Sequence, residues 1–78
     1  ERRADLNKIV KKEGEAIKVT LRNIRRTANT SISNLEKEKK ISKDFERDYT
    51  IEIQELTDKY IKISDDIIAS KIEEISEV

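Results

Sequence analysis

The 78-residue sequence contains no cysteine, histidine, proline or methionine, and it has only one glycine, one phenylalanine and two tyrosines. Without cysteine there are no disulfides and no thiolate chemistry. Without histidine the commonest general base and the commonest metal ligand are missing. Few aromatic residues and 44% charged residues favour long solvated helices over a sheet. We therefore expect an all-α protein without a cofactor or a metal site.

Long apolar runs are missing as well. No stretch approaches the roughly 18 apolar residues of a membrane span, and none has the pattern of a signal peptide. The sequence thus predicts a soluble, intracellular protein with no membrane partner. Because it starts at Glu1 and contains no methionine, we expect it to be a piece of a longer protein, with at most one domain and a thin core.

The two halves of the chain differ in charge, although the net charge is zero. Residues 1–40 carry 12 Lys and Arg against 6 Asp and Glu, a net charge of +6, whereas residues 41–78 carry 5 against 11, a net charge of −6. The first half can therefore attract a polyanion and the second half cannot. The same asymmetry favours antiparallel pairing of the two halves.

Apolar residues recur at helical spacing in both halves. Steps of mostly 3 and 4 residues predict one amphipathic helix from about residue 3 to residue 39 and another from about residue 43 to residue 77. The first series is Val10, Ile17, Leu21, Ile24, Ala28, Ile32 and Leu35, and the second is Phe45, Tyr49, Ile53, Leu56, Tyr60, Ile63 and Ile67. Gly14 interrupts the first helix, where we expect an exposed glycine that costs about 1 kcal/mol relative to alanine.

The connection between the helices is predicted to be short, near Lys40 to Ser42. Ser42 is a good N-cap, and Asp44 places an anion in the first turn of the second helix, where the helix dipole favours it. Short connections join antiparallel neighbours. We expect an antiparallel helical hairpin about 50 Å long.

The apolar faces are wider than a two-helix hairpin needs. Four isoleucines lie beside the main series of the second helix, namely Ile61, Ile68, Ile72 and Ile75, and Leu6 and Ile9 lie at the margin of the first. A helix has so wide an apolar face when it contacts two neighbours. Besides the main series that joins the two helices, we therefore expect a missing third helix, supplied by the same protein or by another chain.

Few residues are suited to catalysis. Asp65 with Asp66 and Glu73 with Glu74 are adjacent pairs, and adjacent residues on a helix point about 100° apart, so neither pair converges on one ligand. A chain with one glycine has no glycine-rich phosphate loop. We predict that the protein is not an enzyme and has no small-molecule substrate.

A basic stripe follows the first helix on the side that we expect to face away from the hairpin core. The stripe consists of Lys11, Lys18, Arg22, Arg25 and Asn29, with Lys8 and Arg26 beside it. Arginine is suited to bidentate phosphate contacts, and no aromatic residues alternate with the charges to stack on bases. The stripe therefore predicts recognition of an RNA backbone by shape and charge. The alternative interpretation is an ordinary solvated face.

Two blocks of the sequence match a known family. They are Arg22-Asn23-Ile24-Arg25-Arg26 followed by Ala28-Asn29, and Gln54 followed by Leu56-Thr57-Asp58-Lys59. Weaker matches are Arg2-Arg3, Asp5-Leu6, Lys8-Ile9-Val10, Ile41-Ser42, Asp44, Asp65 and Lys71. With these residues the whole chain resembles the C-terminal segment of the ribosome recycling factor family.

The resemblance implies a fold and a function. This chain would supply the second and third helices of a three-helix-bundle domain, whose first helix and inserted β-rich domain lie outside it. The family binds the large ribosomal subunit after termination and, with elongation factor G and GTP hydrolysis by that factor, splits the subunits. It acts in the bacterial cytoplasm or in an organelle of bacterial descent.

The resemblance also implies contacts with large-subunit rRNA at Arg3, Arg22 and Arg25. The basic stripe indicates Arg22 and Arg25 independently, whereas Arg3 depends on the resemblance alone. The predicted rRNA-binding site consists of Arg3, Lys18, Arg22, Arg25, Arg26 and Asn29. The rival prediction is a structural hairpin that oligomerises through its apolar face and does not bind RNA.

Overall fold

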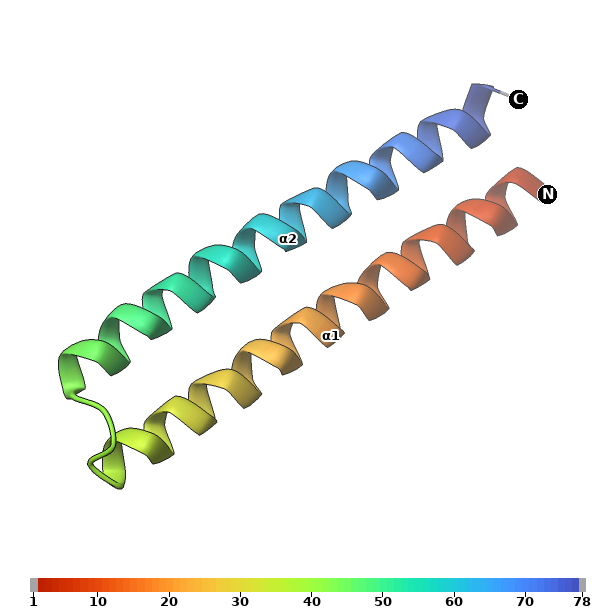
Figure 1. The fold of residues 1–78 in the computed structure, drawn as a ribbon. Coiled ribbons are helices and arrows are strands. Elements are labelled where there is room, and N and C mark those ends of the chain that lie inside the picture. The colour runs from red at the N-terminus through yellow and green to blue at the C-terminus, as the bar shows by residue number, and fades with distance from the viewer. Residues whose placement is uncertain (1, 78) are drawn as a thin grey trace.

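Two long helices make up almost all of the structure, a computed structural model that describes residues 2–77. Helix α1 spans Arg2–Lys37 and helix α2 spans Lys43–Glu77. They lie side by side and antiparallel, with the start of α1 and the end of α2 at the same end of the hairpin (Figure 1). The hairpin is 57 Å long. The predictions of an all-α fold and of an antiparallel hairpin are confirmed.

Helix α1 ends at Lys37, two residues earlier than the sequence predicts. Lys39 has a φ of 60°, a left-handed conformation that glycine usually supplies. The N–H of Lys39 donates to the carbonyl of Glu36 at 2.8 Å, and the N–H of Lys40 donates to the carbonyl of Leu35 at 2.9 Å. This is the hydrogen-bond pattern of a Schellman C-cap. A lysine in the position normally held by glycine conceals the helix end in the sequence.

The start of α2 follows the prediction. The N–H of Phe45 donates to Ser42 Oγ at 3.0 Å, so Ser42 is the N-cap. Asp44 and Glu46 lie in the first turn, where the positive end of the helix dipole stabilises carboxylates. Residues 38–42 form the whole connection between the helices.

The two helices meet mostly through the expected residues of α1, but through a different set of α2 residues from the one expected. Most side chains in the contact are small or are isoleucines, and they are buried or half-buried. They are Val10, Gly14, Leu21, Ala28 and Ile32 of α1, and Ile53, Thr57, Ile61, Ser64, Ile68, Ile72 and Ile75 of α2. The expectation that the main apolar series joins the helices is therefore wrong for most of α2. The small residues allow close approach, whereas the bulkier members of the main series lie to one side.

Gly14 is buried in this contact and is not exposed as expected. A Cβ atom at residue 14 would lie 2.9 Å from Ile68 Cγ1 and 3.1 Å from Ile68 Cδ1. Real Cβ atoms do not approach a neighbour so closely, so the glycine allows Ile68 to pack directly against the backbone of α1. The position looked exposed in the sequence because its neighbour comes from the other helix.

One flank of the hairpin is apolar and open. It carries large side chains whose exposed fractions lie between 40% for Ile63 and 60% for Ile24. The open flank consists of Leu6, Ile9, Ile17 and Ile24 of α1 and Phe45, Leu56, Tyr60, Ile63 and Ile67 of α2. A groove runs between the helices here, lined by Ile17, Leu21, Tyr60, Ile63 and Ile67 among others. No large side chain in residues 2–77 is fully buried, so the hairpin leaves most of its apolar surface uncovered.

Candidate nucleic-acid interface

The basic stripe lies on the side of α1 opposite the open flank. At about 100° per residue, Arg22 points about 160° away from Ile24 around the helix axis. Lys18, Arg25 and Asn29 are half-buried at the margin of the helix contact, whereas Arg22 and Arg26 are exposed. The stripe therefore does not face wholly away from the hairpin core, because its inner members border α2. We call this side the polar flank, made of Lys18, Arg22, Arg25, Arg26 and Asn29 of α1 with Gln54, Asp58 and Asp65 of α2.

Lys18 joins the two helices. Its Nζ lies 2.6 Å from Asp65 Oδ1 of α2 and 3.3 Å from Glu15 Oε1 of α1, and 19% of its side chain is exposed. The hydrogen bond to Asp65, and next the hydrogen bond to Glu15, raise the pKa of Lys18 above its ordinary value of 10.5. The ammonium is charged at neutral pH, and two carboxylates of the hairpin already match that charge.

Arg25 also reaches α2, but its partner there is neutral. Arg25 Nη1 donates to Gln54 Oε1 at 3.2 Å, and Gln54 Nε2 donates in turn to Asp58 Oδ1 at 2.9 Å. No carboxylate lies within ion-pair distance of Arg25 in the described chain, residues 2–77. The guanidinium thus retains its full charge and most of its hydrogen-bond donors.

Arg22 and Arg26 are the two arginines that extend into solvent. Both are exposed, and neither makes an ion pair or a side-chain hydrogen bond with another part of residues 2–77. Together with Arg25 they place three positive charges on slightly more than one turn of α1, which repel one another unless an anion lies nearby. This arrangement suits a phosphate-bearing partner.

The remaining predicted site residues differ in their placement. Asn29 is half-buried, and its Oδ1 is buried without a hydrogen-bond partner in the described residues, so only its NH2 donor is left for an outside group. Arg3 is exposed near the start of α1. It lies about 22 Å along the helix from Lys18, at about 1.5 Å per residue. The structure therefore brings five of the six residues onto one flank and leaves Arg3 apart.

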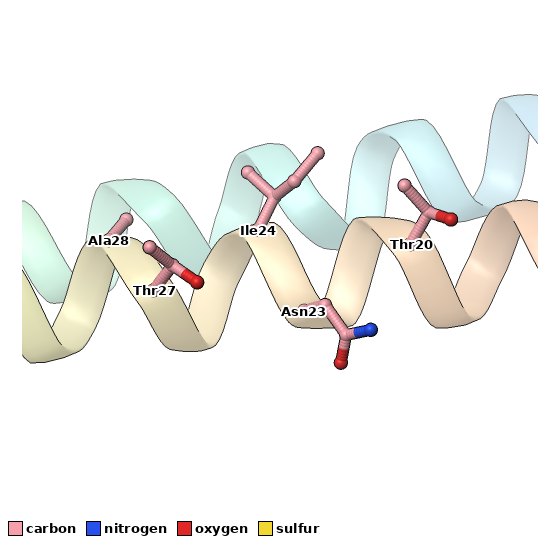
Figure 2. A pocket seen from close by; sticks show the side chains of 5 residues that line it. All are labelled: Thr20, Asn23, Ile24, Thr27 and Ala28. Carbon is pink, nitrogen blue, oxygen red and sulfur yellow. The ribbon is translucent and has the colours of Figure 1, made fainter.

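A hollow also lies on the surface of α1, next to Ile24. Figure 2 shows its lining, Thr20, Asn23, Ile24, Thr27 and Ala28, which all come from successive turns of one helix. Small-molecule sites enclose most of their ligand, and this hollow has no opposite wall. Within residues 2–77 no group of three or more acidic side chains is placed to hold a metal ion. In the same residues, neither helix has a stretch long and apolar enough to cross a membrane.

Gln54, Asp58 and Asp65 are site residues that the sequence did not assign to the basic stripe. Gln54 and Asp58 stand four residues apart, a spacing that places them on one side of α2. The sequence shows that spacing, but it does not show the register of the hairpin, that is, which residues of α1 and α2 lie opposite one another. Only the register reveals that this side of α2 borders Lys18 and Arg25.

Comparison with known proteins places the whole chain in one group. A sequence model described as "Ribosome recycling factor" matches residues 1–75. The ribosome-recycling factor of Nitrosospira multiformis is 51% identical over 78 residues, which cover 100% of this chain and 42% of that protein. The ribosome-recycling factor of Natranaerobius thermophilus is 51% identical over 76 residues, or 97% of this chain and 41% of that protein. The chain spans about two fifths of the length of the curated relatives that it matches.

Proposed function

This chain belongs to the ribosome recycling factor family, and from that premise we propose that it is part of a protein that binds the large ribosomal subunit after termination and helps to split the subunits. In this proposal elongation factor G is the second protein partner, and its GTP hydrolysis supplies the energy. The recycling protein itself acts as a binding and force-transmitting element and not as an enzyme. Its place of action is the bacterial cytoplasm.

We also propose that the hairpin is part of a three-helix-bundle domain, and the open flank supports this. A row of large apolar side chains such as Ile24, Leu56 and Ile67 is about half exposed in the hairpin, and a contiguous exposed apolar patch marks a surface that meets another element or partner. The relatives are more than twice as long as this chain and so contain ample chain for another helix. The hairpin therefore forms two helices of a three-helix bundle, and the third helix covers the open flank.

The polar flank carries the rRNA contacts in this proposal. The observation that supports it best is the exposed, unmatched pair Arg22 and Arg26 beside Arg25, whose partner in α2 is a neutral amide. Such charges bind phosphates and recognise folded RNA by shape and charge. Lys18 contributes mainly by fastening α1 to α2, since its charge is matched by Asp65 and Glu15.

In this proposal the hairpin transmits force along its length. The hairpin is 57 Å long. In its middle part α1 contacts α2 at three levels, namely Gly14 with Ile68, Lys18 with Asp65, and Arg25 with Gln54. A domain docked on rRNA through the polar flank can act as a rigid lever when a force is applied elsewhere on the protein.

Binding of the full-length protein to purified large ribosomal subunits tests the proposal. We expect Arg22→Ala combined with Arg25→Ala to weaken binding by about 2 to 4 kcal/mol, because two charge-assisted contacts are lost. Splitting of post-termination ribosomes with elongation factor G and GTP should fall in parallel. Lys12→Ala combined with Lys37→Ala removes the same charge from exposed positions off the polar flank and serves as the control.

Two results would contradict the proposal. Equal binding by the arginine variant and the lysine control would mean that the arginines form an ordinary solvated face. If the unmodified protein does not bind large subunits at all, a hairpin that assembles through its apolar face is the better account.

A further inference from the structure

A short chain of hydrogen bonds links α1 to α2 beside the exposed arginines. Arg25, Gln54 and Asp58 follow one another at 3.2 Å and 2.9 Å, and the first two are 29 residues apart in the sequence. We propose that Gln54, oriented by Asp58, is a positioning residue that holds the Arg25 guanidinium ready for an rRNA phosphate. The inference rests on the proposed function, because it assigns a role in that same binding site.

The amide of Gln54 is engaged at both ends. Its Nε2 donates to a carboxylate oxygen of Asp58, one turn further along α2, and a carboxylate accepts hydrogen bonds but cannot donate them. The Nε2 end is thereby committed to Asp58, so Oε1 is the end that faces Arg25. Asp58 thus fixes the orientation of the amide, and the amide fixes the position of the guanidinium.

A neutral partner leaves Arg25 able to bind an anion. An arginine has five N–H donors, of which the structure shows one donating to Gln54. A carboxylate in place of Gln54 would pair with the guanidinium directly, often through two hydrogen bonds, and would compete with phosphate. In this arrangement the nearest negative charge on the same network, Asp58, is separated from Arg25 by the amide.

Holding Arg25 in place lowers the entropy lost on binding. A free arginine side chain loses rotamer freedom when it becomes fixed on a partner. Arg22 and Arg26, which have no such support within residues 2–77, lose that freedom on contact. Arg25 is therefore the arginine of the polar flank that is ordered in advance, and contacts of this kind set the register of a protein on a nucleic-acid backbone.

The test measures binding of the full-length protein to purified large ribosomal subunits for Gln54→Met, which retains the size and helix propensity of the side chain and removes both hydrogen bonds. We expect about 3- to 10-fold weaker binding, the range for loss of one supported contact. In an Arg25→Ala background the same substitution should change binding less than about 2-fold, because its target is gone. Ala69→Met, at an exposed position on the side of α2 away from the open flank, is the matched control.

Gln54→Glu sharpens the test. We expect it to weaken binding more than Gln54→Met and to make the dependence of log K on log salt shallower by about 0.7 to 0.9, as if one phosphate contact were lost. Equal effects of Gln54→Met with and without Arg25 would overturn the inference, as would no effect of Gln54→Met where Arg25→Ala weakens binding. If Arg25→Ala itself leaves binding unchanged, the polar flank is not the rRNA site, and the proposed contact falls together with its positioning residue.

Discussion

The two flanks of the hairpin are built from opposite kinds of side chain. The open flank presents large apolar residues with exposed fractions of 40 to 60%, which nothing within residues 2–77 covers. The polar flank closes over the helix contact with long polar side chains, through the Lys18–Asp65 pair at 2.6 Å and the Arg25–Gln54 hydrogen bond at 3.2 Å. The same two helices thus have one side that lacks a partner and one side that supplies its own.

The difference shows how a small hairpin can divide two tasks between its sides. Apolar burial is non-directional and roughly proportional to area, so the open flank can accept any helix of matching shape. Hydrogen bonds and ion pairs are directional, so the polar flank holds Arg25 in one place and leaves Arg22 and Arg26 free within residues 2–77. One flank is suited to completing a domain and the other to meeting an anion.

The largest expected effect comes from a charge on the open flank. Ile67→Asp should lower the free energy of unfolding of the full-length protein by about 3 kcal/mol or more, because an unpaired carboxylate would be buried under the proposed third helix. Urea denaturation measures it. Ala69→Asp places the same charge on the exposed opposite side of α2, where we expect a change within about 0.5 kcal/mol. Equal losses in the two variants would show that the open flank has no cover.

A smaller change in stability is expected from a substitution at Gly14, in the helix contact that lies between the two flanks. Gly14→Ala gains about 1 kcal/mol of helix propensity, but the new Cβ would lie 2.9 Å from Ile68 Cγ1, and overpacking costs about 1 to 3 kcal/mol. We expect a net loss of about 1 kcal/mol, which becomes a gain when Ile68→Ala makes room. Denaturant unfolding of the unmodified protein, the two single variants and the double variant measures these changes in the free energy of unfolding. Stabilisation by Gly14→Ala alone would mean that the helices are further apart than the structure has them.

The smallest effect concerns the ion pair of the polar flank. Because the pKa of Lys18 is raised by Asp65 and Glu15, the pair stabilises the hairpin fully below the ordinary value of 10.5 and is lost as the pH rises through the raised pKa. Asp65→Asn should lower the pKa of Lys18 toward that ordinary value, as measured by NMR titration of its side chain. It should reduce stability less than Gly14→Ala, since the Asp65 side chain is half exposed to solvent. An unchanged Lys18 pKa would rule out the bridge.

The helices and their connection were predictable because their signals are local. The 3- and 4-residue steps, the Ser42 N-cap and Asp44 in the first turn all act within a few residues of the chain. Lys39 was not predictable as a helix end, because its left-handed conformation is one that the residue type disfavours. The predicted end of α1 was therefore two residues late.

The assignment of the contact face was wrong for most of α2, for a physical reason. Both helices are apolar on two adjoining sides, and periodicity reveals the width of an apolar face but not which part of it meets the partner. Ile68 and Ile72 looked marginal and yet lie in the contact, while Leu56 and Ile63 looked central and are exposed. Gly14 packs against Ile68, and a buried glycine of this kind marks the closest approach of two helices.

The candidate site was half predictable. Charge and spacing indicated Lys18, Arg22 and Arg25 from one helix alone, and the structure places them on one flank. Their partners Gln54 and Asp65 belong to a helix whose register depends on the turn and on the packing, which the sequence pattern does not specify. The sequence therefore indicated which charges are present, and the structure distinguishes Lys18, whose charge is matched, from Arg25, whose charge is not.

The central claim, that the polar flank meets rRNA phosphates, is tested most directly by the salt dependence of binding for the single variant Arg25→Ala. The full-length protein and purified large ribosomal subunits would be mixed across a salt series and separated by sedimentation. The account predicts binding weaker by about 1 to 2 kcal/mol and a slope of log K against log salt shallower by about 0.7 to 0.9, with helicity unchanged. An unchanged slope would contradict it, because it would show that Arg25 does not meet a phosphate.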